Sequence, residues 1–309
     1  MEPRGKRRSR GGWRQQCRNR ERAPPIIVWN ARGLMAKEGQ KMAELSSMAV
    51  EEGTELLCLV ETHLDAQYED DELTPPGYQD PIRVDRNVED GAGRRRQRKK
   101  ERGGGVAVWA REGRVLSRIN TRRGSDFEMA AFDDAASGQR YLVIYRRPGP
   151  TVSRGLLEAV EEEAAGAEQL VVVGDLNMNL RAKKPQPRQL HTLLRHELKL
   201  EQRIQFDTRH GKGKRGTLID HFWSRRPALC THIPELSQHS DHRAIRVRQV
   251  ELKPSEGKGK KEWVWRRRWD RVKPEDVQEI LRKEMPGEGG ADQGWKPHRT
   301  EHAAMEMWR

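Results

Sequence analysis

The chain has 309 residues, and its 60 Lys and Arg against 47 Asp and Glu give a formal net charge of +13. Hydrophobic residues make up only 34% of it, and no window approaches the roughly 18 uninterrupted apolar residues that a membrane helix needs. The basic N-terminal segment also lacks the apolar region of a secretory signal peptide. Three widely spaced cysteines, Cys17, Cys58 and Cys230, argue against a disulfide framework or a structural zinc site. We therefore expect an intracellular protein in a reducing compartment, with no membrane partner.

The positive charge is confined to two short segments. Residues 1–23 carry nine basic and two acidic residues, a net of +7, and residues 94–102 carry seven and one, a net of +6. The rest of the chain is balanced, with 44 residues of each sign. Blocks of like charge repel themselves and commonly contact polyanions. We expect residues 1–23 to form a disordered arm and both segments to contact nucleic acid; the alternative is a solvated segment without a specific partner.

Apolar runs and helical spacing predict the elements between these segments and residue 250. Short apolar runs bounded by turn residues predict strands at 26–29, 56–60, 106–110, 126–132, 141–145, 170–173, 217–223 and 244–250, with a further short strand within 77–84. Apolar residues at helical spacing predict helices at 36–52, 154–168 and 187–200. The first strand, helix and second strand are typical of a parallel crossover unit. About eight strands and three helices without strict alternation favour a layered α/β sandwich with mixed sheets.

The composition changes after residue 250. Residues 251–261 form a linker rich in Lys, Gly and Glu, and Trp263, Trp265 and Trp269 stand among the arginines 266–268. One short helix is predicted at 274–285, and the Gly-rich tail is expected to be disordered. The tryptophans are suited either to stacking on nucleic acid or to docking on the preceding domain. We therefore expect an arm at 1–23, a folded domain at 24–250, and a linker with a tail at 251–309.

Polar residues stand where the apolar strands end. They are Asn30, Glu61, Tyr145, Asp175 with Asn177, Asp220, and Asp241 with His242. Each alone is more often a turn residue than a catalyst. Strands packed in a sandwich end side by side, so residues far apart in sequence meet at one rim. The set predicts a functional site at that rim.

Five ordered motifs resemble those of the endonuclease/exonuclease/phosphatase superfamily. They are Asn-Ala-Arg-Gly-Leu at 30–34, Glu-Thr-His-Leu at 61–64, Gly-Asp-Leu-Asn at 174–177, Gly-Thr-Leu-Ile-Asp at 216–220 and Ser-Asp-His at 240–242. In order and spacing they look closest to the apurinic-endonuclease-like domain of non-LTR, LINE-type retrotransposons. The segment after Trp263 is similar to the stretch that joins this nuclease to a reverse transcriptase. The resemblance implies a four-layer α/β sandwich with two mixed β-sheets over residues 24–250.

The resemblance also implies a Mg²⁺-dependent, or Mn²⁺-dependent, endonuclease that nicks DNA and leaves a 3′-hydroxyl for reverse transcription. Hydrolysis of a phosphodiester requires a metal, a base, and donors for the charge on the phosphoryl oxygens. Glu61 offers a carboxylate oxygen suited to Mg²⁺, helped by Asn30, and Asp241 is expected near the metal.

By the family's pattern, the remaining polar residues act on the water and the phosphate. Asp175 activates or orients the attacking water, while Asn177 and Tyr145 donate hydrogen bonds to the phosphate. His242 contacts the scissile phosphate, and Asp220 orients its ring.

Nucleic-acid contacts are expected from residues in the motifs and in the basic loop: Arg32, Arg146, Thr217, Ser240, Arg94, Arg95, Arg96, Lys99 and Lys100. Ser240 is also expected to support its loop. Arg32 departs from the Asn or Asp that many relatives carry. The expected partners are double-stranded DNA and, second, the element's RNA; we expect a monomer, and a nuclear protein that enters through Lys6, Arg7 and Arg8.

Two other functions stay open. A phosphatase or phosphodiesterase of the same fold would act on a small or lipid phosphoester, but residues 217–220 lack the Trp-containing signature of that branch. An inactive retroelement fragment would only bind nucleic acid. The Tyr-Glu-Asp-Asp sequence at 68–71 resembles a polymerase motif superficially, yet it lacks the flanking hydrophobic strands.

Overall fold

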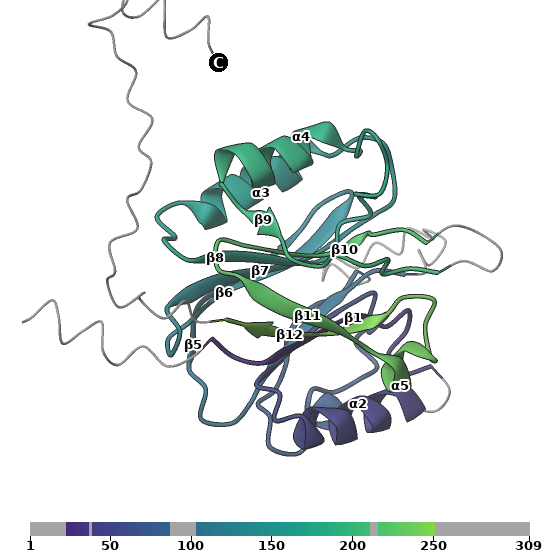
Figure 1. The fold of residues 1–309 in the computed structure, drawn as a ribbon. Coiled ribbons are helices and arrows are strands. Elements are labelled where there is room, and N and C mark those ends of the chain that lie inside the picture. The colour runs from purple at the N-terminus through teal and green to yellow at the C-terminus, as the bar shows by residue number, and fades with distance from the viewer. Residues whose placement is uncertain (1–22, 37–38, 87–102, 211–215, 251–309) are drawn as a thin grey trace, which may run out of the picture. The chain divides into compact units, whose positions relative to one another are not determined.

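The computed structural model describes residues 23–36, 39–86, 103–210 and 216–250. All of them belong to the first of two units into which the chain divides, Met1–Lys253. Two six-stranded sheets lie face to face with helices on their outer sides (Figure 1). The predictions for residues 1–22, 94–102 and 251–309 concern segments outside the described residues. Within the described ranges, no helix is long and apolar enough to cross a membrane.

The strands of the first sheet lie in the order β11, β12, β1, β2, β4, β3, and those of the second in the order β5, β6, β7, β8, β10, β9. The strand bounds are β1 Ile26–Asn30, β2 Leu56–Val60, β3 Ile82–Val84, β4 Val106–Ala110, β5 Leu116–Arg123, β6 Phe127–Asp134, β7 Gln139–Arg146, β8 Leu170–Asp175, β9 Glu201–Gln202, β10 Asp220–Ser224, β11 Ala228–Ile233 and β12 Ala244–Gln249. One pair in each sheet is parallel, β1 with β2 and β7 with β8, and the others are antiparallel. The predicted mixed sheets and the parallel first crossover are confirmed.

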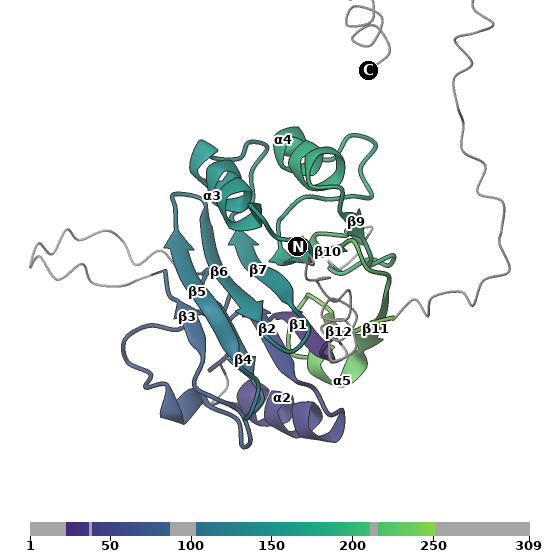
Figure 2. The same cartoon turned by 90° about the vertical axis from the view of Figure 1, so that its left-hand side faces the viewer.

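Helices cover the outer face of each sheet (Figure 2). The helical elements are α2 Gln40–Glu51, α3 Arg154–Ala164, α4 Arg188–Thr192 and α5 Pro234–Ser237, with a 3₁₀ turn η1 Asp71–Leu73 and a π-helical turn η2 Leu193–Glu197. Apolar residues of α2 and α5 pack on the first sheet, and those of α3, α4 and η2 pack on the second. The order helix, sheet, sheet, helix confirms the predicted four-layer α/β sandwich.

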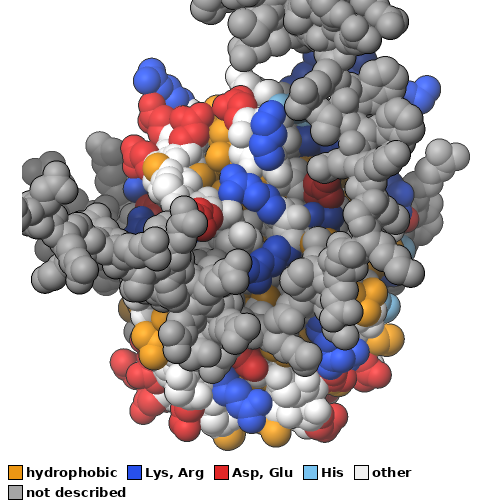
Figure 3. Space-filling model, turned by 60° about the vertical axis from the view of Figure 1, so that its left-hand side comes forward, with side chains coloured by type: hydrophobic (Ala, Val, Ile, Leu, Met, Phe, Trp, Pro, Cys, Tyr) orange, Lys and Arg blue, Asp and Glu red, His pale blue; other side chains and the backbone are white. Residues whose placement is uncertain are grey.

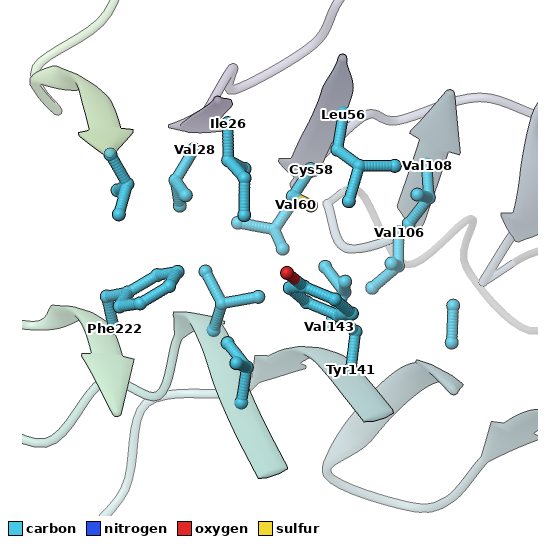
Figure 4. Packing of buried hydrophobic residues seen from close by; sticks show 14 of the residues in the cluster. Ile26, Val28, Leu56, Cys58, Val60, Val106, Val108, Tyr141, Val143 and Phe222 are labelled. Carbon is cyan, nitrogen blue, oxygen red and sulfur yellow. The ribbon is translucent and has the colours of Figure 1, made fainter. Parts of the chain in front are cut away.

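The central core lies between the two sheets (Figure 4). Val28 and Cys58 of the first sheet face Val143 and Phe222 of the second. Successive side chains of a strand point to opposite faces, so the residues between them face the helices. Trp29, for example, belongs to the apolar cluster that includes α2. Burial on both faces explains why these strands are uninterrupted apolar runs in the sequence.

The structure has more strands than the eight expected. The sequence prediction missed β5, β9 and β11, which are edge strands with half-exposed or exposed residues. A strand with one solvated face and a free edge has no continuous apolar run. The helix predicted at 187–200 is divided into α4 and η2, and the strand predicted at 217–223 begins only at Asp220.

Acidic and basic side chains are both present on the surface of the described residues (Figure 3). This agrees with the equal numbers of acidic and basic residues outside the two basic segments.

Candidate active site

The candidate site lies at one rim, where strands of both sheets begin or end. Asn30 is the last residue of β1, and Glu61 follows the parallel strand β2. In the second sheet, Asp175 ends β8 and pairs in register with Asp220, the first residue of β10. Strand β12 starts two residues after His242 and runs antiparallel beside β1, so its start adjoins the end of β1. The predicted convergence of these residues is present in the fold.

His242 and Asp220 form a buried pair. The His242 Nδ1 atom lies 2.8 Å from Oδ2 and 3.1 Å from Oδ1 of Asp220, and both side chains are almost fully buried. Burial would lower the pKa of His242, but the carboxylates of Asp220 and Asp175 outweigh it and raise the pKa to about 9. The ring is therefore a cation at neutral pH. Its Nδ1–H is fixed on Asp220, and its Nε2–H remains as a donor.

Asp175 receives donors from both sheets. The Asn30 Nδ2 atom donates to Asp175 Oδ2 at 2.8 Å, and the backbone N–H of Asn177 donates to Oδ1 at 2.8 Å. The His242 Nδ1 atom lies 3.9 Å from Asp175 Oδ2. Burial and the neighbouring Asp220 carboxylate raise the pKa of Asp175. This carboxylate therefore has a high proton affinity and a fixed orientation.

A sharp turn after β8 orients Asn177. Its backbone has φ +46°, a left-handed conformation that Asn adopts more readily than most residues. The Nδ2 atom donates one hydrogen to the carbonyl of Arg146 at 2.7 Å, and an amide nitrogen carries a second hydrogen. Just before this turn, within β8, Gly174 has φ +123°, and a Cβ atom there would overlap the carbonyl oxygen of Ile144. The end of β8 that presents Asp175 and leads to Asn177 thus requires glycine at 174.

Glu61 and Tyr145 lie together on the other side of the rim. Burial would raise the pKa of Glu61, but hydrogen bonds with His63 and Tyr145 outweigh it and lower the pKa to about 2. Burial and Glu61 raise the pKa of Tyr145 above its ordinary value. Glu61 is therefore ionised and Tyr145 protonated at neutral pH. The guanidinium of Arg86 lies 5.3 Å above the Tyr145 ring and binds Glu128 through two nitrogens.

Asp241 is held by two arginines. Its Oδ2 atom lies 2.8 Å from Arg32 Nη1 and 2.9 Å from Arg209 Nε. Its Oδ1 atom is buried without a hydrogen-bond partner among the described residues, and His242 Nε2 lies 3.9 Å away from it. Burial works to raise the pKa of Asp241, while hydrogen bonds from Arg32 and Arg209 lower it. An ionised carboxylate thus keeps one unpartnered oxygen inside the site.

The donor set fits a hard divalent cation better at Glu61 and Asp241 than at the buried cluster. In the described part of the chain, ligand atoms of Asp175, Asp220 and His242 lie within 4.8 Å of one another. Those side chains already hydrogen-bond to one another or to Asn30. Asp241 offers a free oxygen and Glu61 an ionised carboxylate, the ligands that Mg²⁺ prefers.

Asn30 was expected to help bind the metal, but both polar atoms of its side chain are hydrogen-bonded within the protein. Its amide nitrogen faces Asp175, and its Oδ1 atom accepts the backbone N–H of Arg32 at 3.2 Å. It orients Asp175 across the two sheets.

The structure corrects the expected role of Arg146. This side chain is buried, and its guanidinium donates to the backbone carbonyls of Leu176, Thr151, Gly149 and Asn177. It cannot reach DNA, so the prediction of a nucleic-acid contact is wrong for Arg146.

The other residues predicted to contact nucleic acid lie in different environments. The Ser240 hydroxyl donates to the Asn30 carbonyl at 2.9 Å and accepts the His242 N–H at 3.2 Å, so it supports the turn. Thr217 is partly exposed and pairs through its backbone with Arg209. Arg94, Arg95, Arg96, Lys99 and Lys100 lie outside the described residues.

Two site residues were missed in the sequence. His63 Nε2 lies 3.6 Å from Glu61 Oε2, and its position two residues after Glu61 in the Glu-Thr-His-Leu motif was a signal for it. Arg209 reaches Asp241 because its backbone forms an isolated bridge with His242. No pattern in the sequence marks Arg209 among the many arginines of the chain.

A carboxylate–histidine pair beside ionised carboxylates, at one rim of a four-layer sandwich, is an arrangement suited to phosphoester hydrolysis. The chain belongs to the endonuclease/exonuclease/phosphatase family, whose model matches residues 27–242. No curated protein matches the sequence.

Several solved structures share the fold. The 3′ phosphatase NExo from Neisseria, bound to a product DNA hairpin, is 16% identical with a TM-score of 0.56, over 74% of this chain and 100% of that one. An AP endonuclease from Archaeoglobus fulgidus is 14% identical with a TM-score of 0.52, over 73% and 98%. The human Nocturnin catalytic domain with bound sulfate is 16% identical with a TM-score of 0.51, over 74% and 95%. At sequence identities this low, the similarity shows only that these proteins share a fold.

Proposed function

We propose that the protein is a divalent-metal-dependent endonuclease that nicks double-stranded DNA and leaves a 3′-hydroxyl, as in the target priming of LINE-type retrotransposons. The observation that carries this proposal is the convergence of the His242–Asp220 pair on Asp175, with Glu61 and Asp241 alongside. Membership of the family and the order of the five motifs support it.

The proposed reaction breaks the bond between phosphorus and O3′. A divalent cation held by Glu61 and Asp241, Mg²⁺ or Mn²⁺, would neutralise negative charge on the phosphate. Asp175 is fixed by Asn30 and Asn177 and has a raised pKa. In its ionised form Asp175 would accept the proton of the attacking water, whose oxygen forms the new bond to phosphorus, and the departing O3′ would take a proton from solvent to give the 3′-hydroxyl.

Three donors stabilise the charge that develops on the phosphoryl oxygens. The Nε2–H of the His242 cation faces the site because Asp220 holds the opposite side of the ring. Asn177 offers its second amide hydrogen. Tyr145 offers its hydroxyl once this turns from Glu61, to which it is hydrogen-bonded in the structure. His242 and Asn177 are already oriented by the fold, so they need little reorganisation during the reaction.

The proposed partner is double-stranded DNA, with RNA of the element as a second partner. The basic segments 1–23 and 94–102 would supply attraction to phosphate that does not depend on sequence. We also propose a monomer and nuclear localisation. Imaging of a tagged chain with and without residues 1–23 tests the localisation.

The test of the activity is a nicking assay on supercoiled plasmid with the full chain and Mg²⁺. We expect nicked circles whose ends a DNA polymerase can extend, which reports a 3′-hydroxyl. Asp175→Ala and His242→Ala should each slow nicking by about 10²–10⁴-fold. Arg154→Ala is the matched control, because the Arg154 side chain is 90% exposed on α3.

Three results would contradict the proposal. The active site is wrong if both variants nick as fast as the parent protein. Release of inorganic phosphate from a small or lipid phosphoester, without nicking, would indicate a phosphatase instead. Salt-sensitive DNA binding without cleavage at any Mg²⁺ or Mn²⁺ concentration would indicate an inactive binding protein.

A further inference from the structure

Arg32 bridges the two carboxylates that fit the cation. Its Nη1 atom lies 2.8 Å from Asp241 Oδ2, and its Nε atom lies 3.7 Å from Glu61 Oε2. One guanidinium therefore lies within ion-pair distance of both carboxylates at once.

The backbone around Arg32 is fixed from several sides. Arg32 has φ +46°, a left-handed conformation that costs energy for a residue with a Cβ atom. Its N–H donates to Asn30 Oδ1 at 3.2 Å, and its carbonyl accepts from the Lys41 ammonium at 3.3 Å. The next residue, Gly33, donates its N–H to the Glu61 carbonyl at 2.8 Å. The fold thus holds the start of this side chain beside Glu61.

The guanidinium itself is less confined. The Arg32 side chain is 46% exposed, whereas that of Glu61 is 14% exposed. Hydrogen bonding to Asp241 raises the pKa of Arg32, so it is charged at any accessible pH. Two cations close to the same oxygens repel each other. The Arg32 guanidinium on Asp241 Oδ2, together with Arg209 on the same oxygen, therefore opposes a divalent cation at Glu61 and at the free Oδ1 atom of Asp241. Of the two, Arg32 also lies beside Glu61, and its exposed side chain is able to turn toward solvent.

We propose that Arg32 is an internal competitor for the divalent cation: its guanidinium lies against the carboxylates of Glu61 and Asp241 and opposes cation binding there. This inference rests on the proposed metal-dependent function. It gives the protein a weaker affinity for free Mg²⁺ than the same carboxylates would have without Arg32. The reciprocal effect is that a bound cation loosens Arg32.

The experiment measures cation binding without turnover or DNA. Full-length protein is stripped of metal and titrated with Mn²⁺, and free Mn²⁺ is measured by electron paramagnetic resonance. In Arg32→Gly the competing charge is gone, no new ligand is added, and glycine accepts the positive φ. We expect the Kd for Mn²⁺ to fall by about 5–150-fold, the range of typical coupling between two sites.

Arg118→Gly is the matched control. Arg118 also has φ +46° and also pairs with an aspartate, Asp133, at 3.3 Å. Asp133 pairs with Arg140 near the start of β7, whereas Tyr145 is near its end, so the control lies at the opposite end of the sheet. The control removes one charge in the same backbone conformation and should leave the Kd for Mn²⁺ within about twofold.

Arg32→Met is a second variant in case Arg32→Gly does not fold. Methionine keeps a long side chain but has neither the charge nor an oxygen ligand, so Arg32→Met should also bind Mn²⁺ more tightly than the parent protein. If both Arg32 variants bind Mn²⁺ with the affinity of the parent protein, the inference about Arg32 is wrong, but the proposed metal site is not contradicted. Failure of the parent and all variants to bind Mn²⁺ would overturn the metal site and the inference together.

Discussion

Tyr145 and Arg146 are neighbours in β7 but point to opposite faces of the sheet. Tyr145 faces Glu61 at the rim, whereas the Arg146 guanidinium lies on the α3 side and joins four backbone carbonyls. Alternation along a strand requires this separation. If one of two adjacent residues within a strand faces the site, the other points to the opposite side of the sheet. The mistaken assignment of Arg146 to DNA came from its charge, without regard to that alternation.

Removal of the Arg146 guanidinium should therefore affect stability. Arg146→Met leaves buried carbonyls without donors, and we expect the free energy of unfolding to fall by at least about 2 kcal/mol. Arg154→Met, which removes an exposed arginine paired with Glu158, should change it by less than about 0.5 kcal/mol. Urea unfolding followed by circular dichroism measures both. Equal midpoints for the two variants would contradict the proposed role of Arg146.

The His242 cation also makes stability depend on pH. The folded pKa of His242 is about 9, above its ordinary value of about 6.5. Its contribution to stability is thus fully present below about pH 6.5 and is lost as the pH rises through about 9. The raised pKa of Asp175 acts in the same direction, because ionising this buried carboxyl is costly.

The measurement is urea unfolding in EDTA from about pH 6 to about pH 9.5. Stability of the parent protein should decline over that range. His242→Gln should show a smaller decline, because it lacks the group that loses its proton. Parallel curves for the two proteins would argue against a histidine cation in the folded state.

At the scale of elements, the buried strands were predictable and the edge strands were not. Strands β1, β2 and β4 are buried throughout, and the sequence predicts them within one residue. Strand β5 carries exposed polar and charged residues, which is the composition of a loop as much as of an edge strand. Whether such a segment forms an edge strand or a loop depends on its position in the sheet, and that position depends on strands distant in the sequence.

The sequence predicted those site residues that stand directly at the ends of apolar strands. Asp175, Asp220 and His242 were predicted because each stands beside an apolar run, and the family motifs add their order. Arg209 and the hydrogen bond from Asn30 to Asp175 depend on how two sheets pack. That packing brings together residues 145 positions apart, and no local pattern encodes it.

The end of β8, where Gly174 precedes Asp175, permits a test at the scale of elements. Gly174→Ala adds a Cβ atom against the backbone of Ile144 and strains a positive φ. We expect stability to fall by about 1–3 kcal/mol and nicking to be strongly reduced, because Asp175 moves. Gly155→Ala in α3 has open space and should be neutral or stabilising by up to about 1 kcal/mol. Thermal unfolding and plasmid nicking measure the two effects; normal nicking by Gly174→Ala would show that the turn is tolerant.

At the scale of the whole molecule, affinity and chemistry should be separable. The net charge of +13 resides in residues 1–23 and 94–102, while the remainder is balanced. Deletion of residues 1–23 should weaken DNA binding and reduce the slope of log K against log salt concentration, by about 0.9 for each phosphate group that the arm neutralises. The nicking rate at saturating DNA should stay within about twofold of the parent protein.

Fluorescence anisotropy with a labelled duplex at several salt concentrations measures the slope, and single-turnover nicking measures the rate. An unchanged slope after the deletion would mean that the arm does not bind phosphate. A large fall in the saturated rate would place part of the catalytic apparatus in the arm.

The pairing of β1 with β12 has a consequence during synthesis on the ribosome. These strands are neighbours in the first sheet, although they lie at opposite ends of the described sequence, with Ile26 opposite Val247. At about 5–20 residues per second, roughly 10–40 s pass between the emergence of the two strands. Until then β1 has an open edge, which invites aggregation. A nascent chain therefore has an incomplete candidate site until β12 emerges, because His242 arrives with the strand that closes the sheet.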